Sequence, residues 1–115
     1  HVVADRYSDS TLAYQGGGRQ IDIEWLIRLN KFATYDIEPN VTFYIDVLPE
    51  EALKRKNQEK DRIEMAGIEL QSRVRNAYLE IAKRFQSRYL IIDGHDSIDN
   101  IHDIIISHIK QRKYL

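Results

Sequence analysis

The sequence of 115 residues contains no cysteine, only two prolines and no apolar run long enough to cross a bilayer. The absence of cysteine excludes a disulfide scaffold and a thiolate metal site, and it fits a reducing compartment. Seventeen basic and eighteen acidic side chains leave a formal net charge of −1, so no overall field draws the chain to a polyanion. We therefore expect a cytoplasmic protein with no nucleic-acid partner and no membrane partner.

The composition is otherwise that of an ordinary globular domain. Hydrophobic residues make up 43% of the chain and charged residues 30%. We expect residues 1–115 to form one domain or part of one. The chain enters an apolar run directly after His1, and we interpret His1 as a truncation point or the remnant of a tag.

Polar chemistry is concentrated near the start of the chain. A short apolar run over 2–4 stops at Asp5 and Arg6, which predicts a buried strand that delivers charges at its C-terminal end. Open parallel sheets bind ligands at that edge. The hydroxyl, amide and ring side chains over 10–15 suit a planar ligand that forms hydrogen bonds. The alternative for Asp5 and Arg6 is a buried ion pair at the end of the strand. The three glycines over 16–18 predict a flexible hinge.

The rest of the chain alternates between strand and helix patterns. We expect three strands, over residues 2–4, 41–47 and 89–94. We expect four helices, over residues 23–34 with Asp22 as the cap, from Pro49, over 65–86 and from Ile98. This alternation predicts an α/β fold, with a parallel sheet and helices on both of its faces.

Apolar side chains recur at helical spacing on three of these helices. The helix over 65–86 carries a core stripe of Leu70, Val74, Tyr78, Ile81 and Phe85. The final helix is expected to turn inward Ile98, Ile101, Ile105 and Ile109. The helix over 23–34 is apolar on more than one face, with a repeat of Trp25, Leu29 and Phe32. One face should pack on the sheet, and the other is either a dimer surface or buried between neighbouring elements.

Three segments resemble one family over nearly the whole chain. They are D-R-Y at 5–7 followed by S-T-L-A-Y-Q-G-G-G-R at 10–19, T-F-Y-I-D-V-L-P-E-E at 42–51, and D-R-I-E at 61–64. The chain resembles bacterial thymidylate kinases, and it looks like their C-terminal portion. The resemblance implies a P-loop kinase-type parallel sheet with strand order 2-3-1-4-5, of which this chain would hold three of the five strands. The central first strand and the phosphate-binding loop are missing. We therefore expect the fragment not to fold alone as drawn unless a separate chain, or a missing part of this one, supplies that strand.

The resemblance also implies roles for the acceptor-site segment, about residues 5–19. Arg6 would grip the phosphate of dTMP, since its guanidinium can form two hydrogen bonds with a phosphate. Asp5 would orient the acceptor or hold a Mg²⁺-bound water. Thr11 and Gln15 would face the edge of the pyrimidine, and Tyr14 would lie against the sugar. By physics alone Tyr14 suits the core slightly better than a ligand.

The charged stretch over about 54–64 resembles the lid that closes over the phosphate donor in this family. The implied contacts to ATP are Arg55, Lys60 and Arg62, with Arg55 also counted as catalytic. Without the resemblance, a charge run of this kind indicates a solvated loop.

The resemblance implies a homodimeric enzyme that transfers the γ-phosphoryl group of ATP to dTMP with Mg²⁺, giving dTDP and ADP. Phosphoryl transfer depends mainly on positioning and on positive charge near the moving group. Because the phosphate-binding loop is missing, we expect the chain as printed to be inactive. Two alternatives stay open. One is a non-catalytic nucleotide-binding or dimerisation module, and the other is a kinase for another nucleoside monophosphate.

Overall fold

Two parallel strands lie at the centre of the structure, a computed structural model that describes residues 1–55 and 62–113. β1 (Thr42–Asp46) pairs with β2 (Tyr89–Asp93) along its whole length, residue by residue. The crossover between them runs through α3 (Pro49–Arg55) and α4 (Arg62–Arg84). A helical crossover is what a parallel pair requires. The predicted strands over 41–47 and 89–94 and the α/β class are confirmed.

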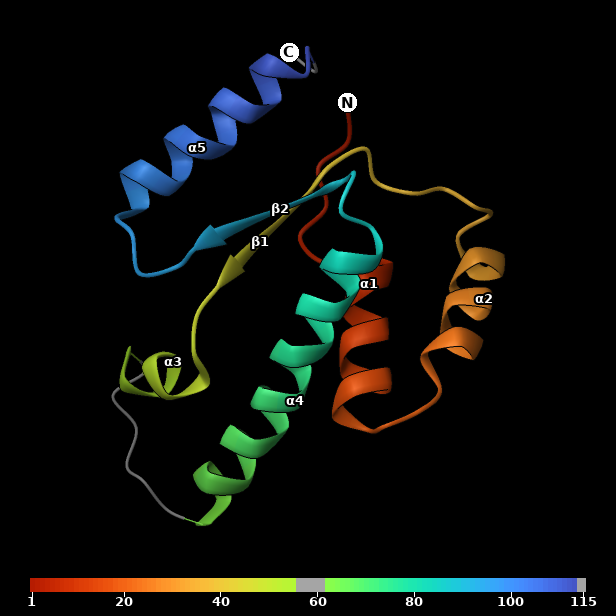
Figure 1. The fold of residues 1–115 in the computed structure, drawn as a ribbon, viewed down its shortest axis with the longest axis vertical. Coiled ribbons are helices and arrows are strands. Elements are labelled where there is room, and N and C mark those ends of the chain that lie inside the picture. The colour runs from red at the N-terminus through yellow and green to blue at the C-terminus, as the bar shows by residue number, and fades with distance from the viewer. Residues whose placement is uncertain (56–61, 114–115) are drawn as a thin grey trace.

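The other helices precede and follow this βαβ unit (Figure 1). They are α1 (Ser8–Thr11), the π-helix η1 (Leu12–Gly18), α2 (Ile23–Ala33) and α5 (Ile98–Gln111). Asp22 caps α2 as predicted, since its carboxylate accepts a hydrogen bond of 3.1 Å from the Glu24 amide. In the described ranges, no helix combines the length and the apolar character that a bilayer crossing requires.

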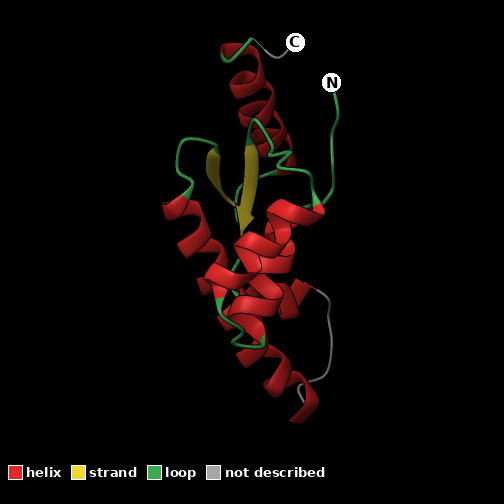
Figure 2. Ribbon diagram, turned by 90° about the vertical axis from the view of Figure 1, so that its right-hand side faces the viewer, coloured by secondary structure: helices red, strands yellow, loops and turns green. Residues whose placement is uncertain are grey.

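Helices cover both faces of the two-stranded sheet. Neighbouring strand residues point to opposite faces. On one face Phe43 meets His108 of α5 edge-on, with ring centroids 5.6 Å apart. On the other face Tyr44 stacks on Tyr78 of α4 at 4.8 Å. Figures 1 and 2 both show the strands between α5 and the remaining helices, as the alternating pattern predicts.

The predicted strand over 2–4 is wrong. These residues are irregular, and the side chains of Val2 and Val3 are 96% and 97% exposed. A strand is held by backbone hydrogen bonds to a neighbour, and within the described ranges the sheet consists of β1 and β2 alone. An apolar sequence without a pairing partner in the described sheet therefore stays irregular and exposed. The described residues form two strands where the sequence predicted three.

The core lies between α4 and the segment formed by α1 and η1. The buried cluster consists of Leu12, Ala13, Leu26, Val74, Ala77 and Ile81. The predicted stripe on α4 is confirmed, because Val74 and Ile81 are 3% and 1% exposed. The prediction for the first turn of α5 is wrong, because Ile98 is 86% exposed. That residue is the first of α5 and directly follows the N-cap Ser97.

The three-glycine segment is not a hinge. All three glycines belong to η1, and none has a positive φ. A Cβ built on Gly17 would lie 2.4 Å from the Cβ of Ala77 and 2.8 Å from the carbonyl oxygen of Arg73. Glycine is therefore required here for the close approach of η1 to α4, and backbone freedom is not its role.

The helix α2 packs against η1 through Leu26 instead of packing on the sheet. This corrects the expectation that one of its faces covers the strands. Trp25, Leu29 and Phe32 are 55%, 45% and 83% exposed. They form a continuous apolar stripe, because their spacing of four and three residues places them on one side of a helix.

Candidate functional site

The predicted acceptor-site residues lie on one short segment that runs along α4. Asp5 and Arg6 are exposed and irregular, and the backbone turns sharply at Arg6, whose φ is 65°. Thr11 is exposed at the end of α1. Tyr14 and Gln15 follow in η1 and are half-buried. The predicted strand end is absent, so a turn and two short helices present these side chains.

Arg6 lies beside a group of tyrosines. Its Cζ atom is 5.7 Å from the centre of the Tyr14 ring, within the range of a cation–π contact. Tyr44 and Tyr78 stack on each other, and the Tyr78 hydroxyl lies 2.8 Å from the Ser10 hydroxyl. We call Tyr14, Tyr44 and Tyr78 the tyrosine cluster. The segment thus joins one exposed cation to aromatic faces and hydroxyls, a combination that suits a phosphorylated ring compound.

Burial raises the pKa of two tyrosines, Tyr44 and Tyr78. Burial, followed by the charge of Asp46, raises the pKa of Tyr44 from its ordinary value of about 10 to about 12. Burial also raises the pKa of Tyr78, against the effect of its hydrogen bond with Ser10. Both phenols therefore stay neutral at physiological pH and serve as hydrogen-bonding groups.

The alternative of a buried ion pair between Asp5 and Arg6 is wrong. Both residues are exposed, and in the described part of the chain Arg6 forms no ion pair. The carboxylate–guanidinium pairs of the fold lie elsewhere. Asp46, at the end of β1, accepts two hydrogen bonds of 2.8 and 2.9 Å from Arg75 of α4. Arg6 is left available for a ligand.

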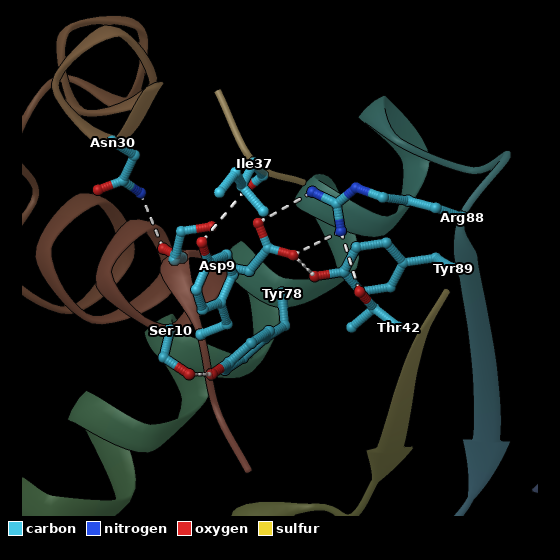
Figure 3. Close-up of polar contacts among 10 residues, drawn as sticks. Asp9, Ser10, Asn30, Ile37, Thr42, Tyr78, Arg88 and Tyr89 are labelled. Carbon is cyan, nitrogen blue, oxygen red and sulfur yellow. Dashed lines mark hydrogen bonds and ion pairs between the residues drawn. The ribbon is translucent and has the colours of Figure 1, made fainter. Parts of the chain in front are cut away.

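The sequence did not indicate Asp9, which is 8% exposed and carries the most connected polar group of the segment. Arg88 donates two hydrogen bonds to its carboxylate, at 2.7 and 3.1 Å, and the Tyr89 hydroxyl donates a third at 2.6 Å (Figure 3). Arg88 also donates to the Thr42 hydroxyl at 3.1 Å. No local pattern predicts a pair separated by 79 positions. The available signals were a lone carboxylate among hydroxyls and a basic residue directly before a strand.

The lid and metal assignments are not tested by the described residues. Lys60 lies outside them, and the side chains of Arg55 and Arg62 are not described although the two residues bound α3 and α4. Within residues 1–55 and 62–113, no three His, Cys, Asp or Glu side chains gather closely enough to hold a metal ion. Asp5 alone fits a cation only through water, since Mg²⁺ keeps several waters and takes few protein oxygens.

Comparisons with known proteins agree on one family. The family model for thymidylate kinase matches residues 1–105. The thymidylate kinase of Sulfurihydrogenibium sp. (strain YO3AOP1) is 45% identical over 114 residues, which cover 99% of this chain and 56% of the relative. That of Kosmotoga olearia is 44% identical over 107 residues, covering 91% of the chain and 51% of the relative. That of Thermosipho africanus is 46% identical over 101 residues, covering 87% and 50%.

The fold and the site define an α/β protein of the parallel-sheet class, with a polar segment carried on a helix beside the sheet. Within this class the chain belongs to the thymidylate kinase family, as its resemblance to that family predicts. The chain spans about half the length of the curated relatives it matches, between 50% and 56% for the three described above.

Proposed function

We propose that the protein is the acceptor-binding portion of a thymidylate kinase, which transfers the γ-phosphoryl group of ATP to dTMP and releases dTDP and ADP. Family membership supports the reaction. The observation that carries the proposal for this chain is the position of Arg6, exposed, unpaired within the described residues and 5.7 Å from the Tyr14 ring. A cation beside an aromatic ring suits a nucleotide, because the cation can bind the phosphate while the ring contacts the sugar or the base.

Each residue of the segment has a task in this proposal. Arg6 holds the acceptor phosphate and neutralises its charge. Tyr14 lies against the deoxyribose, where its ring disfavours a 2′-hydroxyl, and Thr11 and Gln15 form hydrogen bonds with the pyrimidine. Asp5 orients the acceptor or holds a magnesium-bound water. When bound, Mg²⁺ shields the negative charge of the donor and acceptor phosphates.

The donor side is assigned to the lid at about 54–64. Arg55, Lys60 and Arg62 supply positive charge near the phosphates of ATP. The printed sequence contains no G-x-x-x-x-G-K-[ST] segment, which in P-loop enzymes wraps the β- and γ-phosphates. We therefore propose that these 115 residues alone do not phosphorylate dTMP. Incubation with ATP, Mg²⁺ and dTMP is expected to give no dTDP above a protein-free blank.

A calorimetric titration with dTMP tests the acceptor site. Arg6→Ala is expected to weaken dTMP binding at least about tenfold, because a charge-assisted contact to phosphate contributes about 1.5–3 kcal/mol. Thymidine, which lacks the phosphate, should bind the wild type and the variant equally. The matched control is Arg28→Ala, which removes an exposed arginine of α2 and should leave the affinity for dTMP within about twofold.

Four results would contradict this assignment. If wild type binds no dTMP, or if Arg6→Ala binds it normally, the acceptor site is not where we propose. If dCMP or UMP binds better than dTMP, the protein is a kinase for another nucleoside monophosphate. Self-association without any nucleotide affinity identifies a dimerisation module.

The exposed stripe of α2 supports the further proposal of a homodimer. Trp25, Leu29 and Phe32 expose three large apolar side chains on one side of the helix. Exposed apolar patches of this kind mark interaction surfaces.

Phe32→Glu is expected to shift the sedimentation coefficient from that of a dimer to that of a monomer. Ile98→Glu, which alters an exposed isoleucine of α5, is the control and should sediment like wild type; a wild type that is monomeric at all concentrations contradicts the proposal.

A further inference from the structure

We propose that Asp9 is a positioning residue for the acceptor site, held by Arg88 and Tyr89 so that the segment carrying Arg6 and Ser10 keeps one fixed orientation against the sheet. This inference rests on the proposed function and deepens it, since it concerns how the same site is kept in its binding geometry. Asp9 itself contacts no ligand in this proposal. It acts through the backbone of α1, which it joins to the residues that begin β2.

The first part of the segment, α1 and the residues before it, depends on polar contacts, whereas η1 is packed against α4 through Leu12 and Ala13 of the core cluster. The helix α1 has only four residues and no side-chain N-cap, and the chain before it is exposed. Next to the Asp9 contacts, the Asn30 amide donates to the Ser8 carbonyl at 2.8 Å and Tyr7 donates to the Ile37 carbonyl at 3.2 Å. Figure 3 shows these bonds gathered around α1, with the Asp9 carboxylate facing Arg88 and Tyr89.

The geometry of the Asp9 contacts fixes orientation as well as position. Two parallel hydrogen bonds between a planar guanidinium and a planar carboxylate allow little rotation. Arg88 is itself fixed, because its Cζ atom lies 4.6 Å from the Phe85 ring and its Nη1 donates to Thr42 of β1. The position of α1 is therefore tied to both strands and to the end of α4. Ser10, the next residue, meets the Tyr78 hydroxyl at 2.8 Å.

The hydrogen-bonded group of Asp9, Arg88 and Tyr89 is not the arrangement that stability alone favours. Two charges are taken out of water, and the Arg88 Nε atom is buried with no hydrogen-bond partner among the described residues. Well-packed apolar residues often replace a buried ion pair without loss of stability. The charges of the pair also act on their surroundings. Burial by itself lowers the pKa of Arg88, but the Asp9 carboxylate outweighs it and the pKa rises. Burial and then the hydrogen bond to Asp9 raise the pKa of Tyr89, so its hydroxyl stays a donor.

Two measurements on the folded protein test the inference: calorimetric titration with dTMP, and amide hydrogen exchange of residues 8–18. Asp9→Asn keeps the shape of the side chain and removes its charge. It is expected to weaken dTMP binding about tenfold and to speed exchange over 8–18 at least tenfold, with α5 unchanged. Arg88→Lys keeps the positive charge but loses the planar fork, so it should fall between wild type and Asp9→Asn.

The control is Ile92→Ala, which removes a buried side chain of β2 that is 3% exposed. It lowers stability without touching the Asp9 contacts, so dTMP affinity should stay within twofold of wild type and exchange over 8–18 should not change selectively. Equal loss of affinity in Ile92→Ala and Asp9→Asn overturns the positioning role, as does normal dTMP binding by Asp9→Asn.

The exchange measurement separates this inference from the proposed function. If wild type binds no dTMP, the acceptor site is refuted, yet selective exchange over 8–18 in Asp9→Asn still supports the fixed orientation of the segment. If exchange over 8–18 is unchanged in both Asp9→Asn and Arg88→Lys, the inference is wrong whether or not dTMP binds.

Discussion

Replacing Arg88 by methionine is expected to lower the free energy of unfolding by about 3–5 kcal/mol, the range measured when one partner of a buried ion pair is removed. Both side chains of the Asp9–Arg88 pair are only 11% exposed. Methionine fills much of the space but leaves the Asp9 carboxylate buried with one remaining donor, the Tyr89 hydroxyl. Urea unfolding followed by far-ultraviolet circular dichroism measures the loss.

Arg84→Met is the matched control for this prediction. It makes the same substitution in an ion pair with Glu24 whose side chains are 44% and 56% exposed. Exposed pairs contribute at most about 1 kcal/mol, so the control should change stability little. The double variant Asp9→Leu/Arg88→Met should recover part of the loss, because it leaves no unpaired buried charge. Equal losses in Arg88→Met and Arg84→Met would show that the buried pair has no special role.

Gly17→Ala is expected to lower the free energy of unfolding by about 3 kcal/mol, the upper end of what overpacking usually causes. The added Cβ would lie 2.4 Å from the Ala77 Cβ and 2.8 Å from a backbone oxygen of α4, so η1 and α4 must move apart. Such a movement disturbs the core cluster, which lies between these two helices. Thermal or urea unfolding of the variant measures the effect.

Gly67→Ala makes the same chemical change, but here we expect the free energy of unfolding to rise. Gly67 lies in α4, and nothing stands within 4 Å of a Cβ built on it. Alanine there should stabilise the protein by about 0.5–1 kcal/mol, because glycine is the poorer helix former. In the double variant Gly17→Ala/Ala77→Gly the nearest overlap is removed, and part of the stability should return. If Gly17→Ala is as stable as Gly67→Ala, the close approach of the two helices is not real.

The sequence predicted the helices α2 to α5 and the two paired strands because their signals are local. Asp22 precedes α2 and Pro49 begins α3, and both residue types are favoured at a helix start for reasons that involve one turn of backbone. The periodic stripe on α4 identified Val74 and Ile81 as core residues. β-Branched and aromatic residues located β1 and β2 to within one residue at each end.

The errors concern contacts between distant parts of the chain. Val2 and Val3 have the composition of a strand, but strand formation depends on a neighbour that supplies hydrogen bonds. Gly17 lies in a run of three glycines, which is typical of a hinge. Its actual role, the close contact between η1 and α4, depends on the surface of α4 that approaches it. The exposed stripe at Trp25 fits burial or a dimer surface equally well in the sequence. Only the packing of Leu26 against η1 showed which face of α2 is covered.

The candidate site divides in the same way. Arg6, Thr11, Tyr14 and Gln15 were identified from a motif, since they lie within one continuous segment. Tyr44 and Tyr78 were predicted as strand and core residues, and their stacking beside that segment emerged only when α4 folded over β1. Asp9 and Arg88 were missed altogether, because 79 positions separate them and neither belongs to a recognisable pattern.

By itself the sequence determined the family, the places of β1, β2 and the helices α2 to α5, and the segment that carries Arg6, because each follows from residues close together along the chain. The tertiary structure decided which strands form, why glycine stands at position 17 and what holds Asp9. These depend on partners that are distant in sequence, and a backbone hydrogen bond, a close helix contact or a buried charge is stable only when its partner is in place.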